Sequence, residues 1–396
     1  MTSPLHVAVV TETWPPEVNG VAMTLGRMVQ GLLARGHRVS LTRPRQHAYD
    51  MASPAPRLTT TLVRGLPIPG YAGLKFGLPA RRLLCRQWRA ERPDVVQVAT
   101  EGPLGASAIA AARKLGIPVV SEFHTNFHAY SRHYGFGWLE SLVAAHLRRL
   151  HNRSRMTLVP SHQLGVDLAR RGYRNIRVVA RGVDTALFNP ARRSAALRAA
   201  WKVSDDDLVV AHVGRLAPEK NLPLLLSTFA AIRVHAPHAR LLLVGDGPSR
   251  ARLEREHPEH IHAGMRHGED LAAHYASADL FLFPSLTETY GNVTLEALAS
   301  GLPVVAYRMA AAAELIRHGD NGMLADPGIS AQFVRAALDL VSYPGGLRRA
   351  AAAAPQSVAA LDWECIHQRL VAALRDAIGG IAVPSPNEAA HRMLPD

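Results

Sequence analysis

Two carboxylates, Glu288 and Glu296, stand eight residues apart across a short loop that contains Gly291. An apolar run at 280–283 predicts a buried strand before the loop, and the pattern at 293–300 predicts a helix after it. A loop that opens a helix presents backbone N–H groups and the positive helix end, which suits phosphate. Carboxylates beside phosphate fit a ligand that also carries hydroxyls, so the segment predicts a sugar-nucleotide site. The spacing alone fits an ordinary strand–helix unit with two surface glutamates equally well.

Two cationic side chains lie in a loop that follows another predicted strand, residues 208–213. Arg215 can hold phosphate oxygens with two parallel hydrogen bonds, and Lys220 adds a compact positive charge. Basic residues in a loop are usually only solvated. Together with the carboxylate-bearing segment, these two predict the phosphate half of the same site.

The first half of the chain holds two further candidates. Asn19-Gly20 stands at the start of a predicted helix, where glycine lets a diphosphate approach the backbone amides, although such a pair is more often only a cap. His124 follows a predicted strand at 119–122, at the sheet edge where α/β proteins bind ligands, although a lone histidine is more often structural. Neither residue defines a site by itself.

The composition suits two α/β domains. The chain has 396 residues, of which 48% are hydrophobic and only 6% aromatic. Cys85 and Cys365 are far apart without metal-ligand spacing, so we expect a reduced, cytoplasmic compartment. The apolar run at 7–10 follows no basic segment, so we expect no signal peptide. No apolar run approaches the roughly 20 residues that span a bilayer.

Positive charge is concentrated in the first half of the chain. The net charge is +13, and residues 1–190 hold 25 Lys and Arg against 10 Asp and Glu, whereas the remainder holds 20 against 22. Such asymmetry favours an anionic partner, either nucleic acid or a membrane surface. The alternative is an Arg-rich composition without function. We expect no nucleic acid, because no recognised binding motif or array of stacking aromatic residues is present.

Residues 57–92 hold eight of these cations and one acid, Glu91. Leu84 and Trp88 lie one helical turn apart among them. A basic amphipathic helix with an aromatic residue suits an anionic bilayer surface. The alternative is a helix that packs its apolar side on a sheet and exposes its arginines.

Strand-length apolar runs alternate with helical patterns along the chain, which predicts βαβ units and parallel sheets. Strands are expected at 6–10, 38–42, 95–98, 119–122, 156–160, 176–179, 208–213, 240–244, 280–283 and 303–306. We expect an N-terminal domain at 1–185, a linker at 186–200, a C-terminal domain at 201–360, a helix at 361–378 that returns to the first domain, and a disordered tail at 380–396.

Several of these segments resemble the retaining glycosyltransferases of the GT-B architecture, in which two Rossmann-like parallel-sheet domains face each other across a cleft. The resemblance rests on the Glu-x7-Glu spacing, the G-R-L and E-K-N loop at 214–221, the G-D-G-P turn at 245–248 and the interdomain segment GVDTALFNP at 182–190. It covers about residues 5 to 375. The strings LPIPGY at 66–71 and HTNF at 124–127, Tyr130 and HYG at 133–135 are similar to bacterial GDP-mannose-dependent α-mannosyltransferases and to their sulfoquinovosyl and glycolipid relatives.

The resemblance implies a role for each candidate residue. Arg215, Lys220 and the Gly20 loop would stabilise the leaving diphosphate. Glu288 would hold sugar hydroxyls, Glu296 the ribose, and His124 would contact the sugar on its other edge. Arg266 would stack on the base, and the other residues implied to bind the donor are Asp246, Thr289, Tyr290, Gly291, Asn292 and Val293.

The implied reaction transfers a hexose, mannose from GDP-mannose, to a hydroxyl of a membrane lipid, a glycolipid or a saccharide. No Asp-x-Asp motif is present and two cations can replace a divalent ion, so we expect neither a metal nor another cofactor. The protein would be cytoplasmic and peripheral on the inner face of the cell membrane. A UDP-sugar-dependent glucosyl or sulfoquinovosyl transferase of the same family and a sugar-nucleotide 2-epimerase remain alternatives.

The chain departs from the family pattern at 308–314. Many members carry a Gly-Gly-Ala-like loop where this chain has four consecutive alanines, Ala310 to Ala313. Alanine adopts a positive φ only at a cost, so we expect this loop to follow a different backbone path. The donor and acceptor preference is correspondingly less defined.

Overall fold

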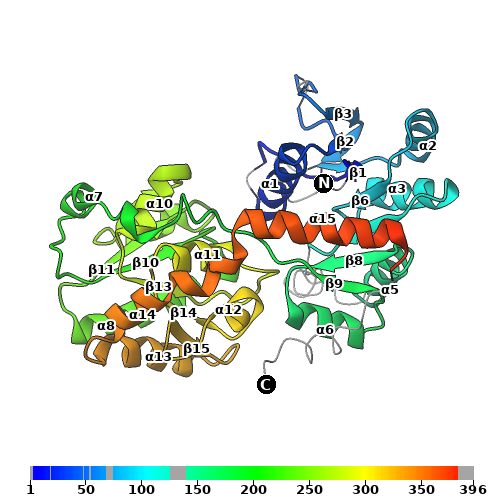
Figure 1. The fold of residues 1–396 in the computed structure, drawn as a ribbon. Helices are drawn as coiled ribbons and strands as arrows, with labels where there is room; N and C mark the ends of the chain where they lie inside the picture. Colours follow the sequence, from blue (N-terminus) through cyan, green and yellow to red (C-terminus); the bar gives the residue numbers. More distant parts are fainter. Residues whose placement is uncertain are drawn as a thin grey trace. The chain divides into compact units, whose positions relative to one another are not determined.

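The computed structural model describes residues 3–17, 19–47, 49–52, 55–67, 75–124 and 140–381, and the chain forms two compact units (Figure 1). Unit 1 is Met1–Arg181 with Trp363–Asp396, and unit 2 is Gly182–Asp362. Residues 68–71, 125–127, Tyr130, 133–135 and most of the expected tail lie outside the described residues, and so do the parts of the family resemblance that they carry.

Unit 2 is built on a six-stranded parallel sheet with the order β12-β11-β10-β13-β14-β15. The strands are β10 (Val209–Val213), β11 (Arg240–Val244), β12 (Ile261–Gly264), β13 (Leu280–Phe283), β14 (Val304–Tyr307) and β15 (Gly322–Ala325). The chain builds one half of the sheet outward from β10 and the other outward from β13. In open α/β sheets, ligands bind outside the carboxyl ends of the strands at such a switch point.

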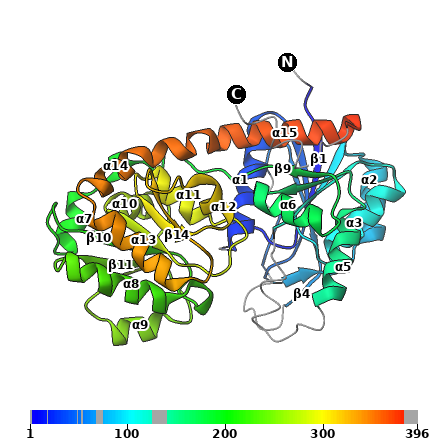
Figure 2. The same ribbon diagram turned by 90° about the horizontal axis from the view of Figure 1, so that it is seen from below.

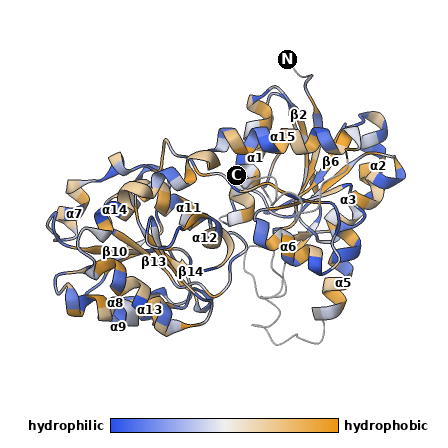
Figure 3. Ribbon diagram, turned by 60° about the horizontal axis from the view of Figure 1, so that its bottom comes forward, coloured by the Kyte–Doolittle hydropathy of each residue, from blue (hydrophilic) through white to orange (hydrophobic). Residues whose placement is uncertain are grey.

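The helices of unit 2 pack around this sheet. They are α7 (Ala195–Ala200), α8 (Leu222–His235), α9 (Arg250–Glu256), α10 (Gly268–Ala276), α11 (Asn292–Ala299), α12 (Ala310–Leu315), α13 (Ser330–Ser342) and α14 (Gly346–Ala353), with short 3-10 helices at Pro190–Arg192, Pro218–Lys220 and Pro355–Leu361. Strands β13 and β14 are continuous apolar runs because helices cover both faces of the sheet. Helices α8 and α13 carry both hydrophobic and hydrophilic residues (Figure 3).

Unit 1 is built on a seven-stranded parallel sheet with the order β3-β2-β1-β6-β7-β8-β9. The strands are β1 (His6–Val10), β2 (Arg38–Pro44), β3 (Leu58–Val63), β6 (Val95–Val98), β7 (Val119–Glu122), β8 (Met156–Val159) and β9 (Ile176–Val178), and β4 (Gly65–Pro67) pairs with β5 (Lys75–Gly77). The helices are α1 (Gly20–Ala34), α2 (Arg81–Ala90), α3 (Pro103–Lys114), α5 (Glu140–His151), α6 (His162–Arg170) and α15 (Trp363–Gly379).

Helix α15 packs beside α1 (Figures 1 and 2). The His367 ring bonds the carbonyl of Arg27 at 3.0 Å. A Cβ at Gly31 would lie 2.2 Å from the same ring, so only glycine permits this close contact between the helices. Helix α15 therefore packs as part of unit 1, although it follows unit 2 in the sequence.

The predicted α/β class with two parallel sheets is confirmed, and each predicted strand exists with its ends within about two residues. Prediction missed the outer strands β3, β12 and β15 and the β4–β5 hairpin. The sequences of β12 and β15, IHAG and GMLA, are short and contain small residues, which gives little apolar signal. Strand β3, LTTTLV, holds three consecutive threonines at an edge of the sheet, so it lacks a continuous apolar run.

The expectation that Leu84 and Trp88 form a lipid-facing surface is wrong. Leu84 is 0% and Trp88 4% exposed, because both pack into the core of unit 1 together with Cys85. The arginines of α2 point the other way and are exposed; they are Arg81, Arg82, Arg86 and Arg89. Helix α2 thus packs its apolar side on the sheet. Among the helices of the described ranges, none has the length and apolarity to cross a bilayer.

Candidate active site

The two loops at the switch point of unit 2 bring Lys220 and Glu288 into contact. Lys220 follows β10 and Glu288 follows β13, and the ammonium group donates to the carboxylate. The Ser285 hydroxyl donates to the same Glu288 oxygen at 2.8 Å, and the Lys220 ammonium lies 5.1 Å from the centre of the Phe283 ring. Both charged side chains are only 15% exposed. The largely buried ion pair therefore connects the predicted phosphate-binding loop with the predicted carboxylate-bearing loop.

Backbone contacts hold these loops in place. The amide of Leu286 donates to the carbonyl of Glu219 at 3.0 Å, which ties the β13 loop to the β10 loop. A Cβ at Gly245, which has a φ of 135°, would lie 2.0 Å from the Gly214 carbonyl oxygen. Glycine is therefore required for this approach of two backbones. The Arg215 guanidinium is 56% exposed and lies 3.7 Å from Glu219, so it remains accessible to a ligand.

No side chain caps the start of α11. Its N-cap is Gly291, which has a φ of 91° and no side chain to bond the first-turn amides. Asn292 and Val293, the first two helical residues, are both partly exposed. The predicted combination of a glycine-bearing loop, a helix start and flanking charges is therefore present in one place.

Glu296 forms a second carboxylate site in α11. The Tyr275 hydroxyl donates to it at 3.0 Å. Burial raises the pKa of Glu296 to about 7, although the hydrogen bond from Tyr275 opposes that shift. Glu296 therefore changes its charge near neutral pH, unlike an ordinary glutamate.

The remaining predicted donor residues of unit 2 differ in accessibility. Tyr290 is 1% exposed, so its ring belongs to the core, and Thr289 beside it is partly exposed. Asp246 is half-exposed and accepts from the Gly247 amide at 2.7 Å. The Arg266 side chain donates to the Ala263 carbonyl at 2.8 Å and to Asp270 at 3.1 Å.

We expected the alanine-rich loop to follow a path that avoids a positive φ, and this expectation is wrong. Ala310 has a φ of 49°, in the left-handed region, and α12 begins there. The next amide, of Ala311, donates to the Tyr290 carbonyl at 2.9 Å, so the strained residue lies where α12 attaches to the carboxylate-bearing loop. The expectation failed because the hydrogen bond from the Ala311 amide outweighs the preference of alanine for a negative φ.

In unit 1, His124 lies between two charged groups at the carboxyl end of β7. The Glu122 carboxylate contacts Nε2 of His124, and a terminal nitrogen of Arg181 lies 3.3 Å from Nδ1. Gln97 also donates to Glu122. The exposed fractions are 2% for Glu122, 7% for His124 and 5% for Arg181. Burial raises the pKa of Glu122, but His124, Gln97 and Arg181 outweigh that effect and hold it below its usual value.

These contacts fix the orientation of the His124 ring. Its Nε2 faces the Glu122 carboxylate and its Nδ1 faces the Arg181 guanidinium, so the ring has a polar partner on each side.

Gly20 lies at the start of α1, as predicted, but part of the expected anion site there is occupied. The Asn19 side-chain oxygen accepts from the amides of Val21 at 3.1 Å and Ala22 at 2.8 Å. The cap thus takes two of the three first-turn amides. A Cβ at exposed Gly20 would lie 3.4 Å from a terminal nitrogen of Arg181.

Sequence reasoning missed Glu122, Arg181 and Tyr275. Glu122 is the last residue of a predicted strand and could have been inferred, because two residues along a strand place Glu122 and His124 on the same face. Arg181 and Tyr275 gave no such signal, since they reach their partners across 57 and 21 residues of sequence.

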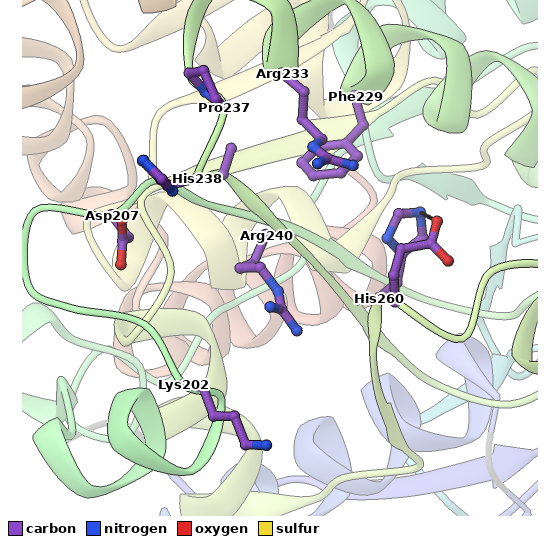
Figure 4. Close-up of a pocket in the computed structure, with 10 residues that line it drawn as sticks. Lys202, Asp207, Phe229, Arg233, Pro237, His238, Arg240 and His260 are labelled. Carbon is purple, nitrogen blue, oxygen red and sulfur yellow. Dashed lines mark ion pairs between the residues drawn. The ribbon is translucent and has the colours of Figure 1, made fainter.

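A pocket of about 240 Å³ opens elsewhere on unit 2, at the amino ends of β10 and β11 (Figure 4). Its lining includes Lys202, Arg233, His238, Arg240 and His260. No described residue of the predicted site lines this pocket, which lies at the sheet edge opposite the ion pair. The candidate site is therefore identified by its chemistry and topology, not by cavity size.

Comparison with known proteins gives matches in both units. A family described as glycosyltransferase family 4 matches residues 18–187, and one described as glycosyl transferases group 1 matches residues 207–343. The chain is 34% identical over 372 residues to the GDP-mannose-dependent alpha-mannosyltransferase of Mycobacterium tuberculosis, covering 93% of this chain and 95% of that protein. It is 34% identical over 274 residues to the sulfoquinovosyl transferase of Arabidopsis thaliana, covering 67% and 53%.

Solved structures agree on the fold. The sucrose-phosphate synthase of Thermosynechococcus elongatus matches with a TM-score of 0.76 and 19% identity, covering 95% of this chain and 99% of that one. Anabaena HepE in complex with UDP and glucose matches with a TM-score of 0.70 and 20% identity, covering 94% and 99%. The predicted GT-B architecture is therefore confirmed.

Proposed function

Because this chain belongs to glycosyltransferase family 4 and is a hexosyltransferase, we propose that it transfers mannose from GDP-mannose to a hydroxyl of a lipid or saccharide acceptor, with retention of configuration. The observation that carries the proposal is the Lys220–Glu288 pair at the switch point of unit 2. A cation suited to phosphate there lies beside a carboxylate suited to sugar hydroxyls, which supports a ligand that carries both groups.

Catalysis would rest on charge that develops on the leaving diphosphate. Arg215, Lys220 and the positive end of α11 would stabilise that charge. Glu288 would hold hydroxyls of the transferred sugar, and His124 of unit 1 would face the same sugar. The diphosphate itself would help to deprotonate the acceptor hydroxyl on the front face of the donor, so no carboxylate nucleophile is needed.

The choice of GDP-mannose is supported by the relatives that share most of the chain. The M. tuberculosis protein and one from Corynebacterium glutamicum, 32% identical over 384 residues, are both GDP-mannose-dependent alpha-mannosyltransferases. The alpha-monoglucosyldiacylglycerol synthase of Acholeplasma laidlawii is less similar, at 25% identity over 338 residues.

A donor panel tests the proposal. The protein would be incubated with radiolabelled GDP-mannose, UDP-glucose or UDP-sulfoquinovose and a bacterial lipid extract, and products separated by chromatography. We expect label to move from GDP-mannose to an acceptor. Transfer only from a UDP-sugar would replace the donor assignment. Conversion of the donor sugar without transfer would indicate an epimerase instead.

An acceptor in a membrane is supported by the surface of unit 1. Helix α5 exposes Leu142 by 64% and Val143 by 40%, and its last turns expose Arg148 and Arg149. Together with the exposed arginines of α2, this surface combines apolar and cationic groups, which suits anionic lipid. We propose that the protein works at the cytoplasmic face of a membrane.

Replacing the four exposed arginines of α2 with Gln should release the protein from anionic vesicles while sparing transfer to a short soluble acceptor. Exposed charges act over roughly 10 Å at 0.1 M salt, so binding should also fade as salt rises. Sedimentation with phosphatidylglycerol vesicles measures it. The control replaces four exposed arginines of unit 2, Arg233, Arg335, Arg348 and Arg349. Wild type that stays in the supernatant at low salt would indicate a soluble acceptor.

The affinity for GDP should rise between pH 6 and pH 8, because the ribose hydroxyls need a carboxylate at Glu296 and its pKa is about 7. The Tyr275→Phe variant loses the hydrogen bond that lowers this pKa, so its affinity should rise at a higher pH than in wild type. Calorimetry across this pH range measures both. A flat profile in wild type would contradict the ribose role.

The raised pKa of Glu296 also predicts how the stability of the fold depends on pH. Its pKa is raised by folding, so its stabilising effect is complete below the ordinary value of 4.5 and is lost as pH rises through about 7. At pH 8, Glu296→Gln should therefore unfold at a higher temperature than wild type while binding GDP more weakly.

A further inference from the structure

The pocket at the amino ends of β10 and β11 collects basic side chains from separate elements of unit 2 (Figure 4). Arg233 lies in the last turn of α8, Arg240 is the first residue of β11, and His260 immediately precedes β12. Phe229 also lines the pocket and lies four residues before Arg233, so both are on the same side of α8. The volume of about 240 Å³ is below the roughly 300–1,000 Å³ of sites that enclose drug-sized ligands, so a smaller molecule fits.

The two arginines of this pocket differ from others in unit 2 because they have no acidic partner. Among the described residues, the guanidinium groups of Arg233 and Arg240 form neither an ion pair nor a hydrogen bond, and Nε of Arg240 is also buried. By contrast, Arg250 and Arg266 each pair with an acidic residue four positions away. Buried polar groups usually have a partner, and an anion bound against Arg240 would supply one.

The pocket also contains two carboxylates, Asp207 and Glu259. The Asp207 carboxylate accepts from the Ser204 amide at 2.7 Å and from its hydroxyl at 2.8 Å, and the Glu259 side chain is 52% exposed. Neither carboxylate pairs with the two arginines, although all four side chains belong to the described part of unit 2. Carboxylates repel a bare phosphate but accept hydrogen bonds from hydroxyls. The lining therefore suits a molecule that carries both a phosphate and hydroxyls.

The other basic residues of the lining contribute less fixed charge. Burial lowers the pKa of His260 to about 4, so its ring is uncharged near neutral pH. Lys202 is exposed and stands three residues before a run of aspartates at 205–207, which compete for its ammonium group. The fixed positive charge of the pocket therefore comes from the two arginines.

We propose that this pocket binds a small phosphorylated sugar or polyol, with its phosphate on Arg233 and Arg240 and its hydroxyls on Asp207 and Glu259. A guanidinium can hold phosphate oxygens with two parallel hydrogen bonds, so two of them can bind one phosphate group. The inference does not depend on the proposed function, because the pocket lies at the sheet edge opposite the Lys220–Glu288 pair. It gives unit 2 a second ligand site.

Calorimetry tests this site with glucose 6-phosphate, inorganic phosphate and glucose as probes. We expect wild type to bind glucose 6-phosphate more tightly than either of the other two. Arg233→Gln and Arg240→Gln should each weaken that binding by about 10- to 100-fold, because hydrogen bonds to a charged group are lost. Glu259→Gln should weaken the binding of glucose 6-phosphate but not that of inorganic phosphate, because only the sugar has hydroxyls for the carboxylate.

Two comparisons locate the ligand. Arg335→Gln removes an exposed arginine of α13 outside the pocket and should leave the affinity unchanged. Lys220→Ala should also keep the affinity of wild type, which matters because glucose 6-phosphate carries the two groups that the candidate active site is proposed to bind. If Arg240→Gln fails to fold, Arg233→Gln still tests the pocket, since Arg233 is exposed on α8.

Glucose 6-phosphate that does not bind wild type would overturn the inference. Binding that Lys220→Ala abolishes and both arginine variants retain would also overturn it, because the ligand would then lie at the candidate active site. Equal affinities for glucose 6-phosphate and inorganic phosphate would overturn the assignment of a sugar phosphate. None of these outcomes changes the proposed transfer from GDP-mannose.

Discussion

Lys220→Ala will lower kcat by about 100- to 1,000-fold without unfolding the protein. Preorganised charge at a leaving group commonly contributes this much to rate. The Lys220 ammonium is held by Glu288 and lies over the Phe283 ring, so protein contacts fix its position. Arg215→Ala should lower kcat by a similar factor, since the two cations are proposed to share the diphosphate charge.

Steady-state kinetics with GDP-mannose measures the effect, and thermal unfolding confirms the fold. A matched control is Lys202→Ala, which removes the same kind of side chain at the opposite edge of the unit 2 sheet. It should retain the activity of wild type. Turnover within tenfold of wild type in both Lys220→Ala and Arg215→Ala would remove the proposed leaving-group site.

Glu288→Gln should also reduce kcat by about 100-fold, while the affinity for GDP changes little. The amide keeps the shape of the carboxylate but accepts the sugar hydroxyls less strongly, because hydrogen bonds to a charged group are about twice as strong as neutral ones. It also releases Lys220 from its partner. The combined Lys220→Ala/Glu288→Gln variant should therefore lose less than the product of the two single losses.

Calorimetry with GDP alone separates the two glutamates. Glu296→Gln should weaken GDP binding, whereas Glu288→Gln should act on turnover with the complete donor. Weak GDP binding in Glu288→Gln together with normal binding in Glu296→Gln would reverse the two assignments. Single losses that multiply in the double variant would show that Lys220 and Glu288 act separately.

The fold was predictable because parallel strands covered on both faces are continuous apolar runs, as at β13 and β14. The candidate site of unit 2 was predictable for a related reason. Its residues follow strands in sequence, and the carboxyl ends of parallel strands meet at one edge, so the contact of Lys220 with Glu288 was implied by topology.

Contacts that depend on packing could not be predicted in this way. Helical spacing placed Leu84 and Trp88 on one face, but the pattern cannot say whether a lipid or the protein covers that face. Ala310 adopts a positive φ because the Ala311 amide bonds Tyr290, a contact across about twenty residues of sequence. The raised pKa of Glu296 depends on burial, which a motif does not reveal.

The contact of Lys220 with Glu288 bears on how the proposed site would discriminate between a nucleotide sugar and other cellular anions. A bare phosphate that approaches Lys220 must compete with a carboxylate that the Ser285 hydroxyl also holds. A bare phosphate carries no sugar hydroxyls that could donate to the displaced Glu288. A donor carries both groups, so its phosphate can take Lys220 while its sugar hydroxyls take Glu288. In the proposed site the pair would therefore act as an internal competitor that only a ligand with both groups displaces without leaving Glu288 unmatched, and inorganic phosphate should be a poor inhibitor.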